Sequence, residues 1–193
     1  QKLHLCVCGI FLDMPGGDQF DEGAVRLMPD VGYTRLDGAV AGERQAALSA
    51  ADMFLFPIDN VQETFGLAPI EAMAAGLPLI VSDWDGMKDT VTEDVGFRVP
   101  TQTLTGAHTV SEGYRYATGL DGYQQFSARL SAMTQIDVPL LTQRLVELAT
   151  NPALRKRMGE APMPRKNGRS PKTSSPASSP CRRRVGCTMS AMR

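Results

Sequence analysis

The sequence is poor in the residues that build several common kinds of site. It has four cysteines and two histidines in 193 residues. Cys181 and Cys187 have no histidine at the spacing of a zinc finger, and the cysteine pattern does not resemble a secreted disulfide framework. His4 and His108 are isolated and have no evident catalytic partner in the sequence. A metal centre is therefore not expected.

Long apolar runs are also absent. No segment approaches the length of a membrane span, and there is no signal-peptide pattern. The cytoplasm is therefore the expected compartment.

Cys6 and Cys8 alternate along a short apolar run, so we expect both side chains to point to the same side of the strand and to be buried, reduced thiols.

Acidic residues are missing from residues 161–193, which hold eight basic residues, five prolines and six serines. The first 160 residues hold 12 basic and 21 acidic residues, a net charge of −9. A segment with so few large apolar residues cannot bury enough surface to offset its ordering entropy. The composition predicts a domain over residues 1–160 and a disordered, basic, Pro/Ser-rich tail over 161–193. Nucleic-acid binding by this tail is the less favoured alternative, so no nucleic-acid partner is expected.

The first 100 residues alternate short apolar runs with helix-forming stretches. Strand patterns occur at 3–8, 33–36, 53–56, 79–81 and 95–99, and helix patterns at 43–51 and 66–75. This alternation predicts an α/β fold with a Rossmann-like, doubly wound parallel sheet flanked by helices. We expect a loop or insertion at 101–122 and helices from 123 to 158. Ligands of such sheets bind beyond the carboxyl ends of the strands, where the loops 57–65 and 82–89 are expected to lie.

The most informative segment is 59–78, which reads DNVQETFGLAPIEAMAAGLP. A buried strand leads into a loop and then into a helix that begins near Gly66. The free N–H groups and the dipole of such a helix start suit a diphosphate, and a glycine there allows close approach to the backbone. Glu63 and Glu71 bracket this start and are able to accept hydrogen bonds from sugar or ribose diols. From the residues alone, a capping Glu63 with a solvated Glu71 is an equally good interpretation.

Glu63 and Glu71 have seven residues between them, and this spacing resembles the E-x7-E arrangement of retaining glycosyltransferases. The surrounding ETFGL, EAMAAGLP and VSDWDG resemble glycosyltransferase family 4, also described as glycosyl transferases group 1. The likeness runs from about residue 3 to 160 and includes NPALR at 151–155 and MGE at 158–160. It implies the C-terminal, donor-binding half of a GT-B fold.

The resemblance implies a role for each matching position. Glu71 would bind the ribose hydroxyls of the nucleotide, and Glu63 would act at the donor sugar as the catalytic carboxylate. The backbone N–H groups of Phe65, Gly66 and Leu67 would meet the sugar hydroxyls or the diphosphate. A nucleotide-diphosphate sugar would be the donor, its anomeric configuration would be retained, and no cofactor or obligatory metal would be needed.

Asp83-Trp84-Asp85 spells D-x-D, the metal-binding signature of a different glycosyltransferase fold. Here it follows a buried strand inside the family 4 block, so we interpret it as a loop near the nucleotide. Trp84 would either stack on a base or pack beneath the loop.

The sequence also departs from the family. The N-terminal acceptor domain and the Arg/Lys pair that grips the diphosphate have no counterpart in it. It is therefore expected to be a fragment that is inactive alone and whose parent associates with membranes, if at all, through the missing domain. The abrupt change of composition after residue 160 suggests a shifted reading frame as a hypothesis.

Other classes stay open. A nucleotide-sugar epimerase or a phosphorylase on the same scaffold is the alternative enzyme, and a nucleotide-binding module without activity is the alternative outside catalysis. The sugar, the base and the acceptor (a glycan, a lipid or a small molecule) do not follow from the sequence.

Overall fold

The apolar runs in the middle of the chain form a three-stranded parallel sheet. The structure, a computed structural model, describes residues 2–10, 14–60 and 62–162. The sheet has the order β3 (Phe54–Phe56), β4 (Leu79–Ser82), β5 (Gly96–Val99). The crossovers are α3 (Leu67–Ala74) and α4 (Asp85–Thr90). Phe54 pairs with Leu79, and Leu79 with Gly96, so the strands are in register along their short length.

Apolar side chains cover both faces of this sheet. Leu79 and Val81 join the cluster formed with α3 and α4, whereas Ile80 between them points to the opposite cluster with Leu148 and Met158. That second cluster comes from α7 (Val138–Thr150) and α8 (Pro152–Gly159). All four residues of β4 are buried, which explains why this strand is a continuous apolar run.

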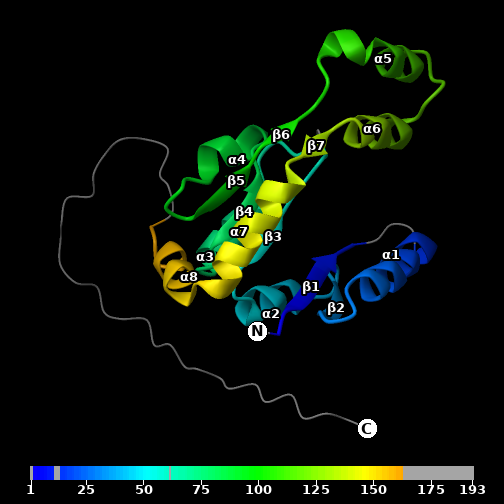
Figure 1. The fold of residues 1–193 in the computed structure, drawn as a ribbon. Coiled ribbons are helices and arrows are strands. Elements are labelled where there is room, and N and C mark those ends of the chain that lie inside the picture. The colour runs from blue at the N-terminus through cyan, green and yellow to red at the C-terminus, as the bar shows by residue number, and fades with distance from the viewer. Residues whose placement is uncertain (1, 11–13, 61, 163–193) are drawn as a thin grey trace.

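The N-terminal strands form a second parallel unit. β1 (His4–Gly9) pairs with β2 (Gly32–Asp37), and α1 (Met14–Leu27) connects them. α2 (Glu43–Ala50) contacts both strands, and Leu48 at its other side packs against the core of the three-stranded sheet. Figure 1 shows β1 and β2 set apart from β3, β4 and β5.

The α/β class, with parallel strands flanked by helices, is confirmed, but the single sheet that we expected is divided. Within the described residues, β1 is hydrogen-bonded to β2 and not to β3. No described side chain of β1 or β2 is buried, and Cys6 is exposed, contrary to the buried thiol expected there. β3 has only three residues, so it offers a short edge for pairing with a fourth strand.

Residues 101–136 form an arm, where only a loop or insertion was predicted for 101–122. β6 (Thr101–Gln102) and β7 (Gln135–Ile136) pair antiparallel at its base, and η1 (Gly106–His108), α5 (Val110–Ala117) and α6 (Tyr123–Ala132) form its length. The arm projects away from the sheet (Figure 1). Tyr116 stacks on Phe126 with ring centroids 4.8 Å apart, and Arg115 and Arg129 both pair with Asp121. The helix α5 depends on these contacts with α6, which a local pattern does not reveal.

The rest of the chain follows the predicted helices. Asp137 caps α7 by accepting a hydrogen bond from the N–H of Leu140, and Asn151 caps α8 in the same way through Leu154. No helix in the described part of the chain is long and apolar enough to cross a membrane. The predicted disordered tail lies, from residue 163 on, outside the described residues.

Candidate functional site

The candidate site lies where the loop after β3 turns into α3. Ser82, buried at the end of β4, donates a hydrogen bond from its hydroxyl to the carbonyl oxygen of Ile58 at 2.7 Å. The side chain of Asn60 accepts from the N–H of Gln62 at 3.0 Å, and its carbonyl oxygen accepts from the N–H of Glu63 at 3.2 Å. The loop is therefore attached to the sheet at one end and turned by its own hydrogen bonds at the other. Val61 within it lies outside the described residues.

Gly66 joins this loop to α3. Its backbone has φ 75°, in the left-handed region that favours glycine. A Cβ at this position would lie 2.8 Å from the Sδ of Met87. The glycine is thus required twice, for its dihedral angle and for its contact with α4, whereas the sequence suggested only close approach of a ligand.

Glu63 caps the helix start in this structure. Its Oε1 accepts hydrogen bonds from the N–H of Gly66 at 2.7 Å and of Phe65 at 3.3 Å. Two of the three N–H groups predicted to meet the ligand are therefore already paired. The N–H groups of Leu67 and Ala68 and the Oε2 of Glu63 have no hydrogen-bond partner within the described residues, so they are open donors and an open acceptor at this point.

Glu71 lies one turn further along α3 and forms an ion pair. Its Oε2 is 3.4 Å from the Nε of Arg44, which extends from the first turn of α2. The side chain of Glu71 is 39% exposed and that of Arg44 is 65% exposed. The carboxylate is therefore oriented by a partner and is still accessible to a ligand.

These residues surround one pocket of about 480 Å³. Four of the five predicted site residues line it, and Gly66 lies between two of them in the chain without lining the pocket itself. The lining residues are Arg44, Glu63, Thr64, Phe65, Leu67, Ala68 and Glu71. Phe65 is 52% and Leu67 66% exposed, so the pocket offers apolar surface beside its two carboxylates.

The start of α4 braces the site from behind. A Cβ on Gly86 would lie 2.5 Å from the carbonyl oxygen of Thr64 and 2.7 Å from the Cα of Phe65. The predicted loops 57–65 and 82–89 are thus in contact, but the second is helical from Asp85 on, where α4 begins. Gly86 was not recognised as a site residue from the sequence, because its constraint comes from a backbone that is distant along the chain.

The D-x-D residues have structural partners. Asp83 lies 3.5 Å from the Nε of Arg98, Asp85 begins α4, and Trp84 packs against the core cluster of the sheet. The second of the two interpretations of Trp84, packing beneath the loop, is the one that this contact supports. Across residues 2–10, 14–60 and 62–162, no three His, Cys, Asp or Glu side chains are grouped closely enough to hold a metal ion.

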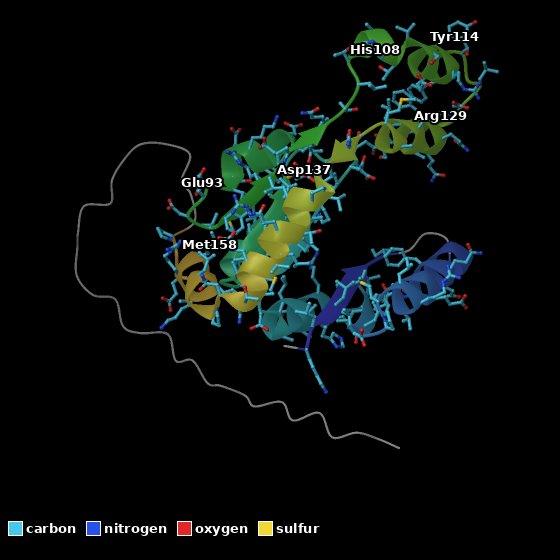
Figure 2. The ribbon with its side chains drawn as sticks, viewed as in Figure 1. Glu93, His108, Tyr114, Arg129, Asp137 and Met158 are labelled. Carbon is cyan, nitrogen blue, oxygen red and sulfur yellow. The ribbon has the colours of Figure 1, made fainter. Side chains whose placement is uncertain are left out.

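A hydrogen bond from the side-chain amide of Gln62 to the hydroxyl of Ser127 on α6 links the site loop to the arm. The two histidines have local partners instead. His4 bonds Thr34 on the neighbouring strand at 2.9 Å, and His108 bonds Thr105 at 2.9 Å. Figure 2 shows His108, with Tyr114 and Arg129, on the projecting arm.

Arg44 is the main site residue that the sequence analysis missed. A signal for it existed, since α2 follows the carboxyl end of β2, and the start of such a helix belongs to the same edge of a parallel sheet. Only the loops after the third and fourth predicted strands were considered. The E-x7-E motif drew attention to two carboxylates and not to the cation that pairs with one of them.

The fold and the site define an α/β domain that presents a helix start and two carboxylates in an open pocket. A family model described as glycosyl transferases group 1 matches residues 2–109, which is more than half of the chain. The chain belongs to this family of glycosyltransferases, whose general reaction moves a sugar from a donor to an acceptor. None of the curated proteins compared with it gives a match.

The matched region ends at residue 109, directly after η1. It includes β1 to β6, Arg44 and every predicted site residue, whereas α5, α6 and the closing helices α7 and α8 follow it. The likeness of residues 110–160 to the closing part of family 4 stays a prediction.

Proposed function

We propose that this pocket binds the nucleotide-diphosphate sugar donor of a retaining glycosyltransferase. The observation that supports the proposal best is the convergence of Glu63, Glu71 and the start of α3 on one pocket in a chain of the group 1 family. Glu71 takes the ribose hydroxyls, and the open N–H of Leu67 takes a phosphate or sugar oxygen. The dipole of α3 favours the negative charge of the diphosphate there.

Glu63 has two tasks in this proposal, one for each oxygen. Oε1 stays with the N–H groups of Gly66 and Phe65 and maintains the shape of the loop. Oε2 accepts a hydroxyl of the donor sugar and stabilises the positive charge that develops at the anomeric carbon as the bond to the diphosphate breaks. Neither task requires a cofactor.

Transfer also needs a second wall. Phe65, Leu67 and Glu71 are all at least 39% exposed, so water reaches the pocket freely. Glycosyl transfer without hydrolysis requires that water be excluded and the acceptor be positioned. We therefore propose that an acceptor-binding domain closes this pocket for transfer, and that the open pocket binds a donor without transferring its sugar.

The experiment is a titration of the folded chain with UDP, GDP, ADP and their sugar conjugates. Binding is measured by calorimetry and by the chemical shifts of the backbone amides. We expect one base to be preferred and the largest shifts at Phe65, Gly66 and Leu67. Glu71→Gln should weaken binding of both the nucleotide and its sugar conjugate about tenfold, because a hydrogen bond to a charged group contributes about 1.5–3 kcal/mol.

Glu63→Gln separates the two tasks of that residue. The amide oxygen of glutamine is still able to accept from the N–H of Gly66, so the loop should keep its shape. We expect the variant to lose the preference for the sugar conjugate and to bind the bare nucleotide nearly as before. Glu93→Gln is the matched control, since Glu93 lies on an exposed turn at the end of the sheet that is distant from the arm (Figure 2). A folded sample with no shift near residues 65–71 for any of these ligands would contradict the proposal.

A further inference from the structure

The pocket presents an electrostatic problem that its two carboxylates do not solve. A nucleoside diphosphate is an anion, and Glu63 and Glu71 both line the space it would enter. Like charges at short range repel, and the repulsion is stronger beside a protein surface than in bulk water. A site with this composition needs a cation close to the carboxylates.

Arg44 is the one basic residue among the described residues that line the pocket. The Nε of its guanidinium lies 3.4 Å from the Oε2 of Glu71. Arginine has five N–H donors in a fixed planar fork. The side chain of Arg44 has no other polar partner among the described residues, so its two amino groups are open to a ligand.

The stability of α2 does not explain why an arginine occupies position 44. Arg44 is in the first turn of α2, at the end of the helix where a positive charge is unfavourable and an acid such as Glu43 is favourable. Its pair with Glu71 is exposed, and pairs of this kind contribute little to folding. The ion pair is therefore better explained by what it does to the pocket.

We propose that Arg44 is a third anchor of the donor, which positions Glu71 through Nε and donates its amino groups to the diphosphate. This inference rests on the proposed function. In the free protein Arg44 neutralises one carboxylate of the pocket. In the complex it holds Glu71 toward the ribose and compensates the phosphate charge, and the planar fork matches a pair of phosphate oxygens.

The experiment measures the affinities of three proteins, the unaltered chain, Arg44→Ala and Arg44→Lys. The ligands are each nucleoside diphosphate, the corresponding nucleoside and inorganic pyrophosphate. Arg44→Ala should weaken binding of the diphosphate at least tenfold and binding of the nucleoside less than threefold. It should also reduce the salt dependence of diphosphate binding. Arg44→Lys should recover part of the loss, because it restores the charge without the fork. The side chain is 65% exposed, so both variants should fold.

Arg157→Ala is the matched control, because it removes an arginine from an exposed position of α8. It should leave all affinities unchanged. If Arg44→Ala weakens nucleoside and diphosphate by the same factor, or changes neither, the role at the diphosphate is wrong while the proposed function stands. If the unaltered, folded chain binds none of UDP, GDP, ADP or their nucleosides, the proposed function fails and the role of Arg44 fails with it.

Discussion

Two parallel units of this chain have the same local architecture and very different cores. In the three-stranded sheet, Leu79, Ile80 and Val81 are fully buried between helices on both faces. In the β1–β2 pair, every described side chain of the strands keeps some contact with solvent. The candidate site loop and α3 follow strands of the first unit. A loop that must hold two carboxylates and a helix start in place benefits from attachment to a well-buried part of the fold.

The largest test of this comparison substitutes one apolar residue in each unit. Ile80→Ala removes a fully buried side chain from β4 and should lower the free energy of unfolding by about 2–5 kcal/mol. Leu5→Ala at a half-buried position of β1 should cost clearly less, about 1 kcal/mol. Urea denaturation followed by circular dichroism measures both, and equal losses would contradict the difference between the cores.

A second test adds a methyl group to each unit. On Gly96 of β5 a Cβ would lie 2.6 Å from the Cβ and from the carbonyl oxygen of Leu79. Gly96→Ala should therefore destabilise the chain by about 1–3 kcal/mol through overpacking. A Cβ on Gly9 of β1 would meet nothing within 4 Å, so Gly9→Ala should change stability by less than about 0.5 kcal/mol. The same denaturation experiment serves, and a larger cost at Gly9 would show that β1 is covered in solution.

A third test concerns a polar contact between β2 and α1 in the β1–β2 unit. The hydroxyl of Tyr33 donates to Asp21 on α1 at 2.5 Å, and partial removal of the hydroxyl from water together with this hydrogen bond raises the pKa of Tyr33 from 10.0 to about 12. Tyr33→Phe should cost on the order of 1 kcal/mol at neutral pH.

The raised pKa fixes the sign of the pH dependence. The contribution of Tyr33 is fully present below pH 10 and is lost as the pH rises toward about 12, since the folded protein holds the proton more tightly than the unfolded chain. The stability difference between the unaltered chain and Tyr33→Phe should therefore shrink over that interval. A difference that stays constant from pH 9 to 12 would mean that the contact with Asp21 does not persist in solution.

Much of this architecture was predictable. The predicted strand at 79–81 is observed as Leu79–Ser82, and the predicted helix at 66–75 as Leu67–Ala74. Both have strong local signals, a continuous apolar run in one case and a glycine at each end of the helix in the other. The arm was missed because α5 is stabilised by stacking and ion pairs with α6, which residue patterns within 110–117 do not contain.

The sequence by itself determined the α/β class, the position of the helix start and the two carboxylates around it, since each depends on local spacing and on residue type. Only the tertiary structure decided that Gly86 supports the loop and that Arg44 reaches Glu71. Those facts depend on how separate strands and helices are brought together by burial of apolar surface. Contacts of that kind have no fixed spacing along the chain.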